Sequence, residues 1–521
     1  MSELDTAEEI VAVAAEVVAS GVDALAQCDL DDQQLLAYDV AHAASAVEAC
    51  RSVLAYGRHG DHEAALACVY VADVAHDLAG RTFGCESAWG ITDSAMATTR
   101  DFVGRNRRID ALARLASDPG PAHLDDDFSL VADTFRRFAE EKIAPVAEHV
   151  HRTNGDVPEE IISGLAELGA FGLSVPEEYG GFADGGSNDY LGMVVATEEL
   201  SRASLGIGGS LMTRPEILTR ALVRGGTEEQ KQHWLPRLAT GEIMAAVAVT
   251  EPDYGSDVAG VRVGAALGDD GWRISGTKTW CTFAARADVL LLLARTEPGT
   301  TDHRGLSGFV VPKERGDGHG FVLTQEGGGR MEARPIDTIG YRGMHSYEIA
   351  FDDWLVAPDC QIGGADGRGR GFYYQMEGFE NGRLQTAARA VGVMQAAYEA
   401  AREYAADRVV FGRPIAEYQL TQAKLGRMAA MIQASRQFMY RVAELMADGD
   451  GTLEASMIKA YVCRAAEWVT REALQIHGGM GYAEEYAVSR YYVDARVLSI
   501  FEGADETLCL KVIARRLLAD R

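Results

Sequence analysis

The stretch MAAVAVTEPDYGSDVAG (244–260) marks a change in the character of the chain. The segments that follow it alternate short apolar runs with glycine and charged residues: DGWRISGTKTWCTF (270–283), ADVLLLLAR (287–295), LSGFVVPK (306–313) and YEIAFDDWLV (347–356). Runs of this length, rich in branched and aromatic residues, are typical of β-strands. Residues 243–362 are therefore expected to form a β domain.

Helical sequence flanks this region on both sides. Before it, DFSLVADTFRRFAEEKIAP (127–145) and EEIISGLAELGAFGL (159–173) are amphipathic, and Thr227 is a candidate helix N-cap. After it, the glycine-rich run 363–371 lacks the spacing of a phosphate-binding loop and is expected to be a connector. From there to the end, apolar stripes at helical spacing predict a bundle.

The first 120 residues read as a separate helical segment. Apolar side chains recur at three- and four-residue steps in 35–54 and 63–78, and the prolines on either side of Gly120 end the pattern. We expect a mainly α chain with a central β domain. Its parts would be a helical extension (1–120), a helical domain (121–242), a β-barrel or sandwich domain (243–362) and a C-terminal four-helix bundle (363–521). The length of 521 residues suits this division, at roughly 150 residues per domain.

Composition excludes several classes of function. The chain has 78 acidic and 49 basic residues, a net charge of −29 with neutral histidines, and no basic patch, which disfavours nucleic-acid binding. No apolar run approaches the ~18 residues of a membrane span, and the acidic N-terminus does not resemble a signal peptide. The eight cysteines form no CxxC pair and show no zinc spacing. We therefore expect a cytoplasmic protein with reduced thiols and no metal.

Six motifs between residues 249 and 508 carry a family resemblance. They are VTEPDYGSDVAG (249–260), ISGTKTWCTFAARAD (274–288), IGYRGMHSYEIAFDDWLVAP (339–358), DRVVFGRPI (407–415), QIHGGMGYAEEY (475–486) and IFEGADETL (500–508). Together they make residues 125–521 resemble the acyl-CoA dehydrogenase family, flavin enzymes that oxidise acyl-CoA thioesters between Cα and Cβ. The resemblance implies FAD as cofactor and electron-transferring flavoprotein as partner.

The chemistry of that reaction explains the residue types. An α-proton must be removed by a positioned base, and a β-hydride must be accepted by a group that no side chain supplies. By resemblance, Glu502 is the base, and its burial against the ligand would raise the pKa of its carboxyl. The alternative is a surface acid near the C-terminus. Relatives that carry the base beside Arg383 have a carboxylate there, whereas this chain has Gly382. Gly503 and Arg383 are expected to contact the substrate.

The resemblance also implies two sets of flavin contacts. The set within one subunit would be Val249, Thr250, Gly255, Ser256, Trp280 and Thr282, with Ser256 also contacting the substrate. Trp280 could instead be a core tryptophan. The set reaching the FAD of a neighbouring subunit would be Arg408, Phe411, Gln475, Gly478 and Gly479, which implies a homodimer or homotetramer. Ala504 and Glu506 stand where relatives commonly have FAD-contacting threonine and glutamine, so those two roles are not carried over.

The long extension, with GMHSYEIAFDDW and IFEGADE, narrows the resemblance to family members that oxidise a branched dicarboxylic thioester. This resemblance implies methylsuccinyl-CoA as the substrate and mesaconyl-CoA as the product. A buried carboxylate needs a cation, and Arg214 is the one cation in SLGIGGSLMTRPEIL (204–218), the expected helix at the acyl tip. Alternatively Arg214 reaches the surface or pairs with Glu216. Gly206 to Gly209 would leave room for the branch. Arg342 and His345 are the next candidates for the carboxylate.

Three other functions remain to be separated. An acyl-CoA oxidase would pass its electrons to oxygen instead of a flavoprotein. A short-chain or short-branched-chain acyl-CoA dehydrogenase could carry residues 1–116 as a partner-binding module. A non-enzymatic relative that binds DNA through the same fold would need a basic C-terminal face, and both Glu502 and the acidic balance disfavour it.

Overall fold

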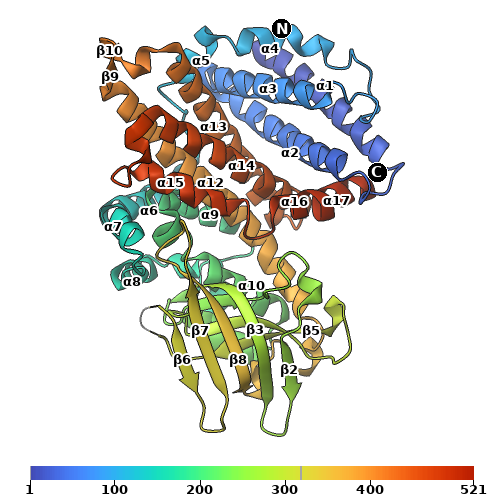
Figure 1. Cartoon of the computed structure of the whole chain (residues 1–521), viewed down its shortest axis with the longest axis vertical. Helices are drawn as coiled ribbons and strands as arrows, with labels where there is room; N and C mark the ends of the chain where they lie inside the picture. The colour runs from blue at the N-terminus through green and yellow to red at the C-terminus, as the bar shows by residue number, and fades with distance from the viewer. Residues whose placement is uncertain (1, 317–318) are drawn as a thin grey trace. The chain divides into compact units, whose positions relative to one another are not determined.

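A computed structural model describes residues 2–316 and 319–521. The chain forms two compact units (Figure 1). One combines Met1–Val131 with Thr386–Arg521, and the other is Ala132–Gln385. Two long helices cross the unit boundaries along the chain, α6 (Asp126–Phe138) and α12 (Gly371–Asp407).

The first unit is helical. Figure 1 shows the three long helices of the N-terminal extension beside α13 and α14, and α2 contacts both of these. Small residues such as Ala37 and Ala41 are fully buried on α2, which lets neighbouring helices approach closely. The bounds are α1 Glu3–Leu25, α2 Gln34–Tyr56, α3 Asp61–Thr82, α4 Arg100–Asn106, α5 Ile109–Leu115, α13 Gln419–Ala447, α14 Thr452–His477, α15 Ala487–Leu498, α16 Asp505–Thr507 and α17 Ala514–Ala519.

The second unit combines helices with a β-sheet. Thr227 caps α11 as expected, because its hydroxyl accepts from the Gln230 backbone N–H while the Gln230 side chain accepts from that of Thr227. One expectation is wrong: residues 204–218 are not a single helix. Ser204 is extended, with φ −160°, and a short π-helical turn at Leu205–Gly209 precedes α10. The bounds are α7 Ala144–Thr153, α8 Glu159–Glu167, α9 Ser187–Ala203, α10 Thr213–Gly225 and α11 Glu228–Ala239.

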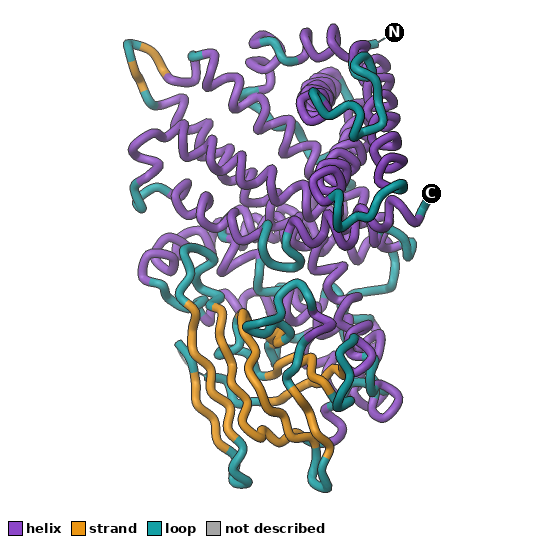
Figure 2. The backbone as a smooth tube through the Cα atoms, turned by 45° about the vertical axis from the view of Figure 1, so that its right-hand side comes forward, coloured by secondary structure: helices purple, strands orange, loops and turns teal. Residues whose placement is uncertain are grey.

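The sheet is curled and, among the described residues, has eight strands (Figure 2). Its order is β1-β4-β2-β3-β8-β7-β6, with β5 paired to β4. The bounds are β1 Ala245–Ala248, β2 Gly264–Leu267, β3 Trp272–Thr282, β4 Val289–Arg295, β5 Leu306–Pro312, β6 Phe321–Thr324, β7 Arg330–Ile336 and β8 Ser346–Val356. The five strands expected from the sequence are β1, β3, β4, β5 and β8, and the remaining three were not foreseen.

Two features of this unit position the candidate site. Helices α10 and α11 bury Leu218, Leu222 and Leu238 against β1, β4 and β5, which fixes them on one face of the sheet. The long β3–β8 pair is interrupted by register shifts, one of them between Lys278 and Cys281. Such irregularities re-aim a side chain and often lie beside functional sites. Among the described residues, no helix is long and apolar enough to cross a membrane.

Candidate active site

A buried ion pair anchors the turn that follows β1. Lys278 is fully buried, and its Nζ donates to Glu251 Oε1 and to the Val249 carbonyl, both at 2.8 Å. Glu251 Oε1 also accepts from the Val263 backbone N–H at 2.8 Å, and Oε2 accepts from that of Arg262 at 2.7 Å. Burial lowers the pKa of Lys278, and the Glu251 carboxylate opposes that shift. The start and the end of the turn are therefore tied to one carboxylate.

The tip of this turn is open to solvent. Gly255 and Ser256 are exposed, and a Cβ atom added at Gly255 would meet nothing within 4 Å. Thr250, at the start of the turn, accepts at its carbonyl from the Thr279 backbone N–H at 2.8 Å, which joins the turn to β3. The turn thus combines fixed ends with an accessible tip, which is the arrangement that a ligand-binding loop needs.

Trp280 lies at the irregular end of β3 and is not a core residue. Its side chain is 55% exposed and its φ is +57°, a left-handed conformation that is strained for a bulky residue. Thr282, two residues on, is buried, with its Oγ1 3.0 Å from Ser346 Oγ. An exposed indole on a strained backbone beside a buried hydroxyl is the arrangement expected where a flat ligand stacks.

Arg214 is buried at the first turn of α10. It is 5% exposed, and its Nη1 has no hydrogen-bond partner among the described residues. Its guanidinium carbon lies 6.0 Å from the centre of the Tyr341 ring. Glu216, the acid with which Arg214 could have paired, lies 3.6 Å from Arg220 Nε and accepts from the Asn381 amide. Arg214 is therefore a buried cation placed to receive an anion.

The glycines that precede α10 do not leave room for an acyl branch, contrary to expectation. A Cβ atom at Gly206 would lie 2.3 Å from the Arg342 carbonyl oxygen, and one at Gly209 would lie 1.8 Å from Ser201 Oγ. At Gly208 it would lie 2.5 Å from a backbone oxygen. The space above these glycines is filled by the chain itself, so glycine is needed here for close packing.

The two other candidates for a substrate carboxylate already have protein partners. Arg342 donates from Nη1 to the His151 carbonyl at 2.8 Å and from Nε to the Thr338 carbonyl at 3.3 Å. His345 Nε2 lies 3.1 Å from the Gly155 carbonyl oxygen and 3.2 Å from a carboxylate oxygen of Asp156. Of Arg214, Arg342 and His345, Arg214 is thus the best placed to bind a substrate carboxylate. Arg383, the other predicted substrate contact, is partly buried on α12.

Glu502 belongs to the other compact unit, in the loop between α15 and α16. Its Oε2 is buried, and it accepts no hydrogen bond from the described part of the chain, so Glu502 is not a surface acid. Its φ is +53°, and that of Gly503 is +98°. The fully buried Lys459 donates to the Gly503 carbonyl oxygen, and the guanidinium of Arg389 lies 4.8 Å from the Phe501 ring centre. Within residues 2–316 and 319–521, no ion pair neutralises the carboxylate that this loop presents.

Two exposed edges of the same unit carry the remaining predicted contacts. The hairpin of β9 (Val409–Val410) and β10 (Arg413–Pro414) holds Arg408, which is exposed, and Phe411, which is 94% exposed. At the end of α14, Gln475, Gly478 and Gly479 are exposed, and Cβ atoms at both glycines would meet nothing within 4 Å. The Phe411 ring and these glycines are thus accessible to a ligand or to another subunit.

Three family models match the chain in order. The acyl-CoA dehydrogenase N-terminal domain matches residues 125–242, the middle domain 246–354 and the C-terminal domain 369–518. The (2S)-methylsuccinyl-CoA dehydrogenase of Cereibacter sphaeroides is 45% identical over 401 residues, 77% of this chain and 71% of that protein. The chain belongs to the acyl-CoA dehydrogenase family. The family resemblance is thereby confirmed, and with it acyl-CoA dehydrogenase activity and the fold class.

Other members of the family agree. A 2-methylacyl-CoA dehydrogenase of Solanum tuberosum is 36% identical, over 76% of this chain and 91% of that protein. The solved structure of a glutaryl-CoA dehydrogenase with glutaryl-CoA has a TM-score of 0.69 and 29% identity, covering 77% of this chain and 97% of its own. That of butyryl-CoA dehydrogenase from Megasphaera elsdenii has a TM-score of 0.68 and 30% identity, covering 76% and 99%.

Acyl-CoA dehydrogenases are FAD-dependent, and the structure leaves a candidate surface for this cofactor exposed. In one unit the exposed turn tip at Gly255 and the half-exposed indole of Trp280 offer a backbone edge and a stacking face. The ion pair between Lys278 and Glu251 beneath them was missed in the sequence. Both residues lie inside motifs quoted above. The signals for the ion pair are a lysine within a strand and a glutamate before a proline, and each is easily taken for a surface charge.

Proposed function

We propose that this acyl-CoA dehydrogenase oxidises (2S)-methylsuccinyl-CoA to mesaconyl-CoA. The observation that carries this choice of substrate is Arg214, a buried guanidinium whose Nη1 has no hydrogen-bond partner among the described residues. A buried cation without a counter-charge is costly, so its presence favours a ligand that brings a carboxylate. The 45% identity to a (2S)-methylsuccinyl-CoA dehydrogenase supports the same substrate.

When bound, FAD would supply the oxidant for the β-hydride, because no side chain can accept it. We assign its binding within the subunit to Val249, Thr250, Gly255, Ser256, Trp280 and Thr282, because this set combines fixed backbone with exposed faces. A solved relative, a glutaryl-CoA dehydrogenase of Mycobacterium smegmatis with 26% identity and a TM-score of 0.67, is described in complex with FADH2. It covers 76% of this chain and 95% of its own.

Glu502 takes the α-proton. Its Oε2 accepts no hydrogen bond within the described residues, so a lone pair is available for the proton. The backbone N–H of Glu502 donates to the thioester oxygen and stabilises the negative charge that develops there. Ser256, Arg383 and Gly503 contact the acyl-CoA.

Neighbouring subunits complete the FAD site through Arg408, Phe411, Gln475, Gly478 and Gly479, in a homodimer or homotetramer. The exposure of the Phe411 ring supports this assignment. The electrons pass to electron-transferring flavoprotein in the cytoplasm. A solved structure with 30% identity and a TM-score of 0.69, covering 77% of this chain and 99% of its own, is described under the electron-transferring flavoprotein of Acidaminococcus fermentans.

A substrate profile tests the proposal. The purified holoenzyme is assayed anaerobically with electron-transferring flavoprotein as acceptor, on (2S)-methylsuccinyl-CoA, butyryl-CoA and isovaleryl-CoA. The proposal predicts the highest kcat/KM for methylsuccinyl-CoA and mesaconyl-CoA as the product. A higher value for butyryl-CoA would contradict the dicarboxylic substrate. Stoichiometric peroxide in air, with no turnover of the flavoprotein, would make the enzyme an oxidase.

A further inference from the structure

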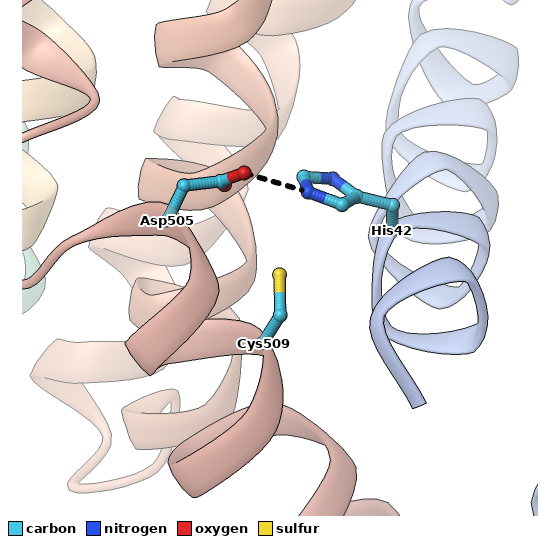
Figure 3. Close-up of side chains that lie close together, drawn as sticks. All are labelled: His42, Asp505 and Cys509. Carbon is cyan, nitrogen blue, oxygen red and sulfur yellow. Dashed lines mark hydrogen bonds and ion pairs between the residues drawn. The ribbon is translucent and has the colours of Figure 1, made fainter. Parts of the chain in front are cut away.

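The N-terminal extension contributes two buried side chains to the loop that carries Glu502. Tyr38 and His42 lie on α2, one helical turn apart, and both contact Asp505, three residues after Glu502. Tyr38 donates its hydroxyl to Asp505 Oδ2 at 2.5 Å, and His42 Nε2 lies 3.2 Å from the same oxygen. Figure 3 shows the His42 ring pointing from α2 toward the Asp505 carboxylate. We refer to Tyr38, His42 and Asp505 as the α2 clamp.

The clamp holds a charged carboxylate by neutral donors. Burial lowers the pKa of His42, which favours the neutral imidazole, and its Nε2–H tautomer can donate to the carboxylate. Burial alone would raise the pKa of Asp505, but the hydrogen bonds from His42 and Tyr38, together with the charges nearby, outweigh burial and lower that pKa. Arg464, whose guanidinium lies 5.7 Å from the Tyr38 ring centre, adds a favourable charge. Hydrogen bonds to a charged acceptor are among the stronger ones in proteins.

The loop beside the clamp needs such support. Glu502 adopts φ +53°, a left-handed conformation that is strained for a non-glycine residue and persists only where neighbours impose it. Lys459 holds the Gly503 carbonyl, and the Asp505 backbone N–H donates to the Ser499 carbonyl oxygen at 3.1 Å. These contacts fix the loop backbone from within the C-terminal segment. The α2 clamp holds the end of the loop, at Asp505, through side chains that belong to the extension.

We infer that α2 of the extension positions the base Glu502 through Asp505, with Tyr38 and His42 as positioning residues. The inference rests on the proposed role of Glu502 as the base. It gives the extension a part in catalysis without contact with substrate, since an error of about 1 Å in a reacting group lowers rates by about 100-fold. The extension is thus more than a packing or partner-binding module.

A metal ion is the competing explanation of this cluster. The ligand atoms of His42, Asp505 and Cys509 lie within 4.8 Å of one another (Figure 3). Two observations favour hydrogen bonding instead. Asp505 Oδ2 is already bonded to Tyr38 and His42, and burial raises the pKa of the Cys509 thiol, which keeps its proton. A metal at one ion per chain in the purified holoenzyme, lost together with activity on chelation, would overturn the inference.

A matched pair of variants tests the positioning role. Tyr38→Phe removes one hydroxyl between the extension and the Glu502 loop. Tyr70→Phe removes one between the extension and α14, where the Tyr70 and Tyr461 hydroxyl oxygens lie 2.7 Å apart. Both should lower the melting temperature of the holoenzyme by similar amounts. We expect only Tyr38→Phe to slow anaerobic flavin reduction by the acyl-CoA, about tenfold, with Tyr70→Phe within about twofold of wild type.

A second readout isolates the base from the flavin. A 3-thia acyl-CoA has sulfur at the β position and cannot lose a hydride, so exchange of its α-hydrogens with deuterated water reports proton removal alone. This exchange should slow about tenfold in Tyr38→Phe. It should also slow in His42→Leu, whereas His42→Gln, which keeps a donor, should exchange faster than His42→Leu. Equal exchange rates in Tyr38→Phe and Tyr70→Phe would refute positioning. Unimpaired exchange in Glu502→Gln would instead refute the assignment of the base.

Discussion

Arg214→Met is expected to lower kcat/KM for (2S)-methylsuccinyl-CoA by roughly 150- to 5,000-fold. Loss of one partner from a buried charge pair costs about 3–5 kcal/mol, and each 1.36 kcal/mol is a factor of ten in rate. The structure adds a second, opposite expectation for stability. Because Nη1 of Arg214 lacks a partner in the described protein, methionine removes an uncompensated buried charge. The offsetting loss is the contact with the Tyr341 ring, about 2 kcal/mol for a desolvated pair. The free energy of unfolding should therefore stay the same or rise.

The assay compares steady-state kinetics on methylsuccinyl-CoA and butyryl-CoA with urea unfolding of the same preparations. Arg220→Met is the matched control, because Arg220 lies on the same helix but is ion-paired with Glu216. It should change both substrates by a similar, small factor. Equal losses on the two substrates in Arg214→Met, or a marked fall in its stability, would show that Arg214 is structural and refute the carboxylate assignment.

Three further outcomes are expected. Lys278→Met should lower the free energy of unfolding by about 3–5 kcal/mol in urea titrations, because it strands the buried Glu251 carboxylate, and Glu251→Gln in the same chain should restore part of that loss. Arg408→Ala should weaken FAD retention about tenfold on dilution, measured by released flavin fluorescence, and full retention would disprove that contact. Burial lowers the pKa of His42 in the folded state; the charges of Arg464 and Arg81 act in the same direction, and Asp505 opposes them. The contribution of His42 to the free energy of unfolding should therefore be fully present above pH ~6.5 and be lost as the pH drops below it. Urea unfolding at several pH values should show a flatter profile for His42→Gln.

The sequence predicts features that depend on neighbouring residues. Strand β4 is a continuous apolar run, and Thr227 caps α11 because the residues needed stand three positions apart. Strands β2, β6 and β7 were missed because their own residues do not carry a clear strand pattern. They are short or carry exposed charges and a proline. They form through pairing with other strands: β2 with β3, β7 with β8, and β6 with β7.

Features that join distant segments could not be predicted from one sequence. Tyr38 and Asp505 are separated by 467 positions, and nothing near either residue indicates the other. The glycines before α10 were interpreted as open space, whereas the structure fills that space with the Arg342 carbonyl and Ser201. The roles of Glu502 and Arg408 came from a family resemblance rather than from any local pattern. The local sequence gives composition and spacing, but tertiary contacts determine what each residue meets.

The proposed chemistry is tested most directly by mixing the FAD-loaded enzyme anaerobically with one equivalent of (2S)-methylsuccinyl-CoA. The flavin absorbance should bleach in a single turnover, and mesaconyl-CoA should form in equal amount. Glu502→Gln should keep FAD and bind the substrate, yet bleach at least 100-fold more slowly, because general-base catalysis supplies about 10²–10⁴-fold. Bleaching at the wild-type rate in Glu502→Gln, or no bleaching of the wild-type enzyme by methylsuccinyl-CoA while butyryl-CoA reduces it, would contradict the proposal.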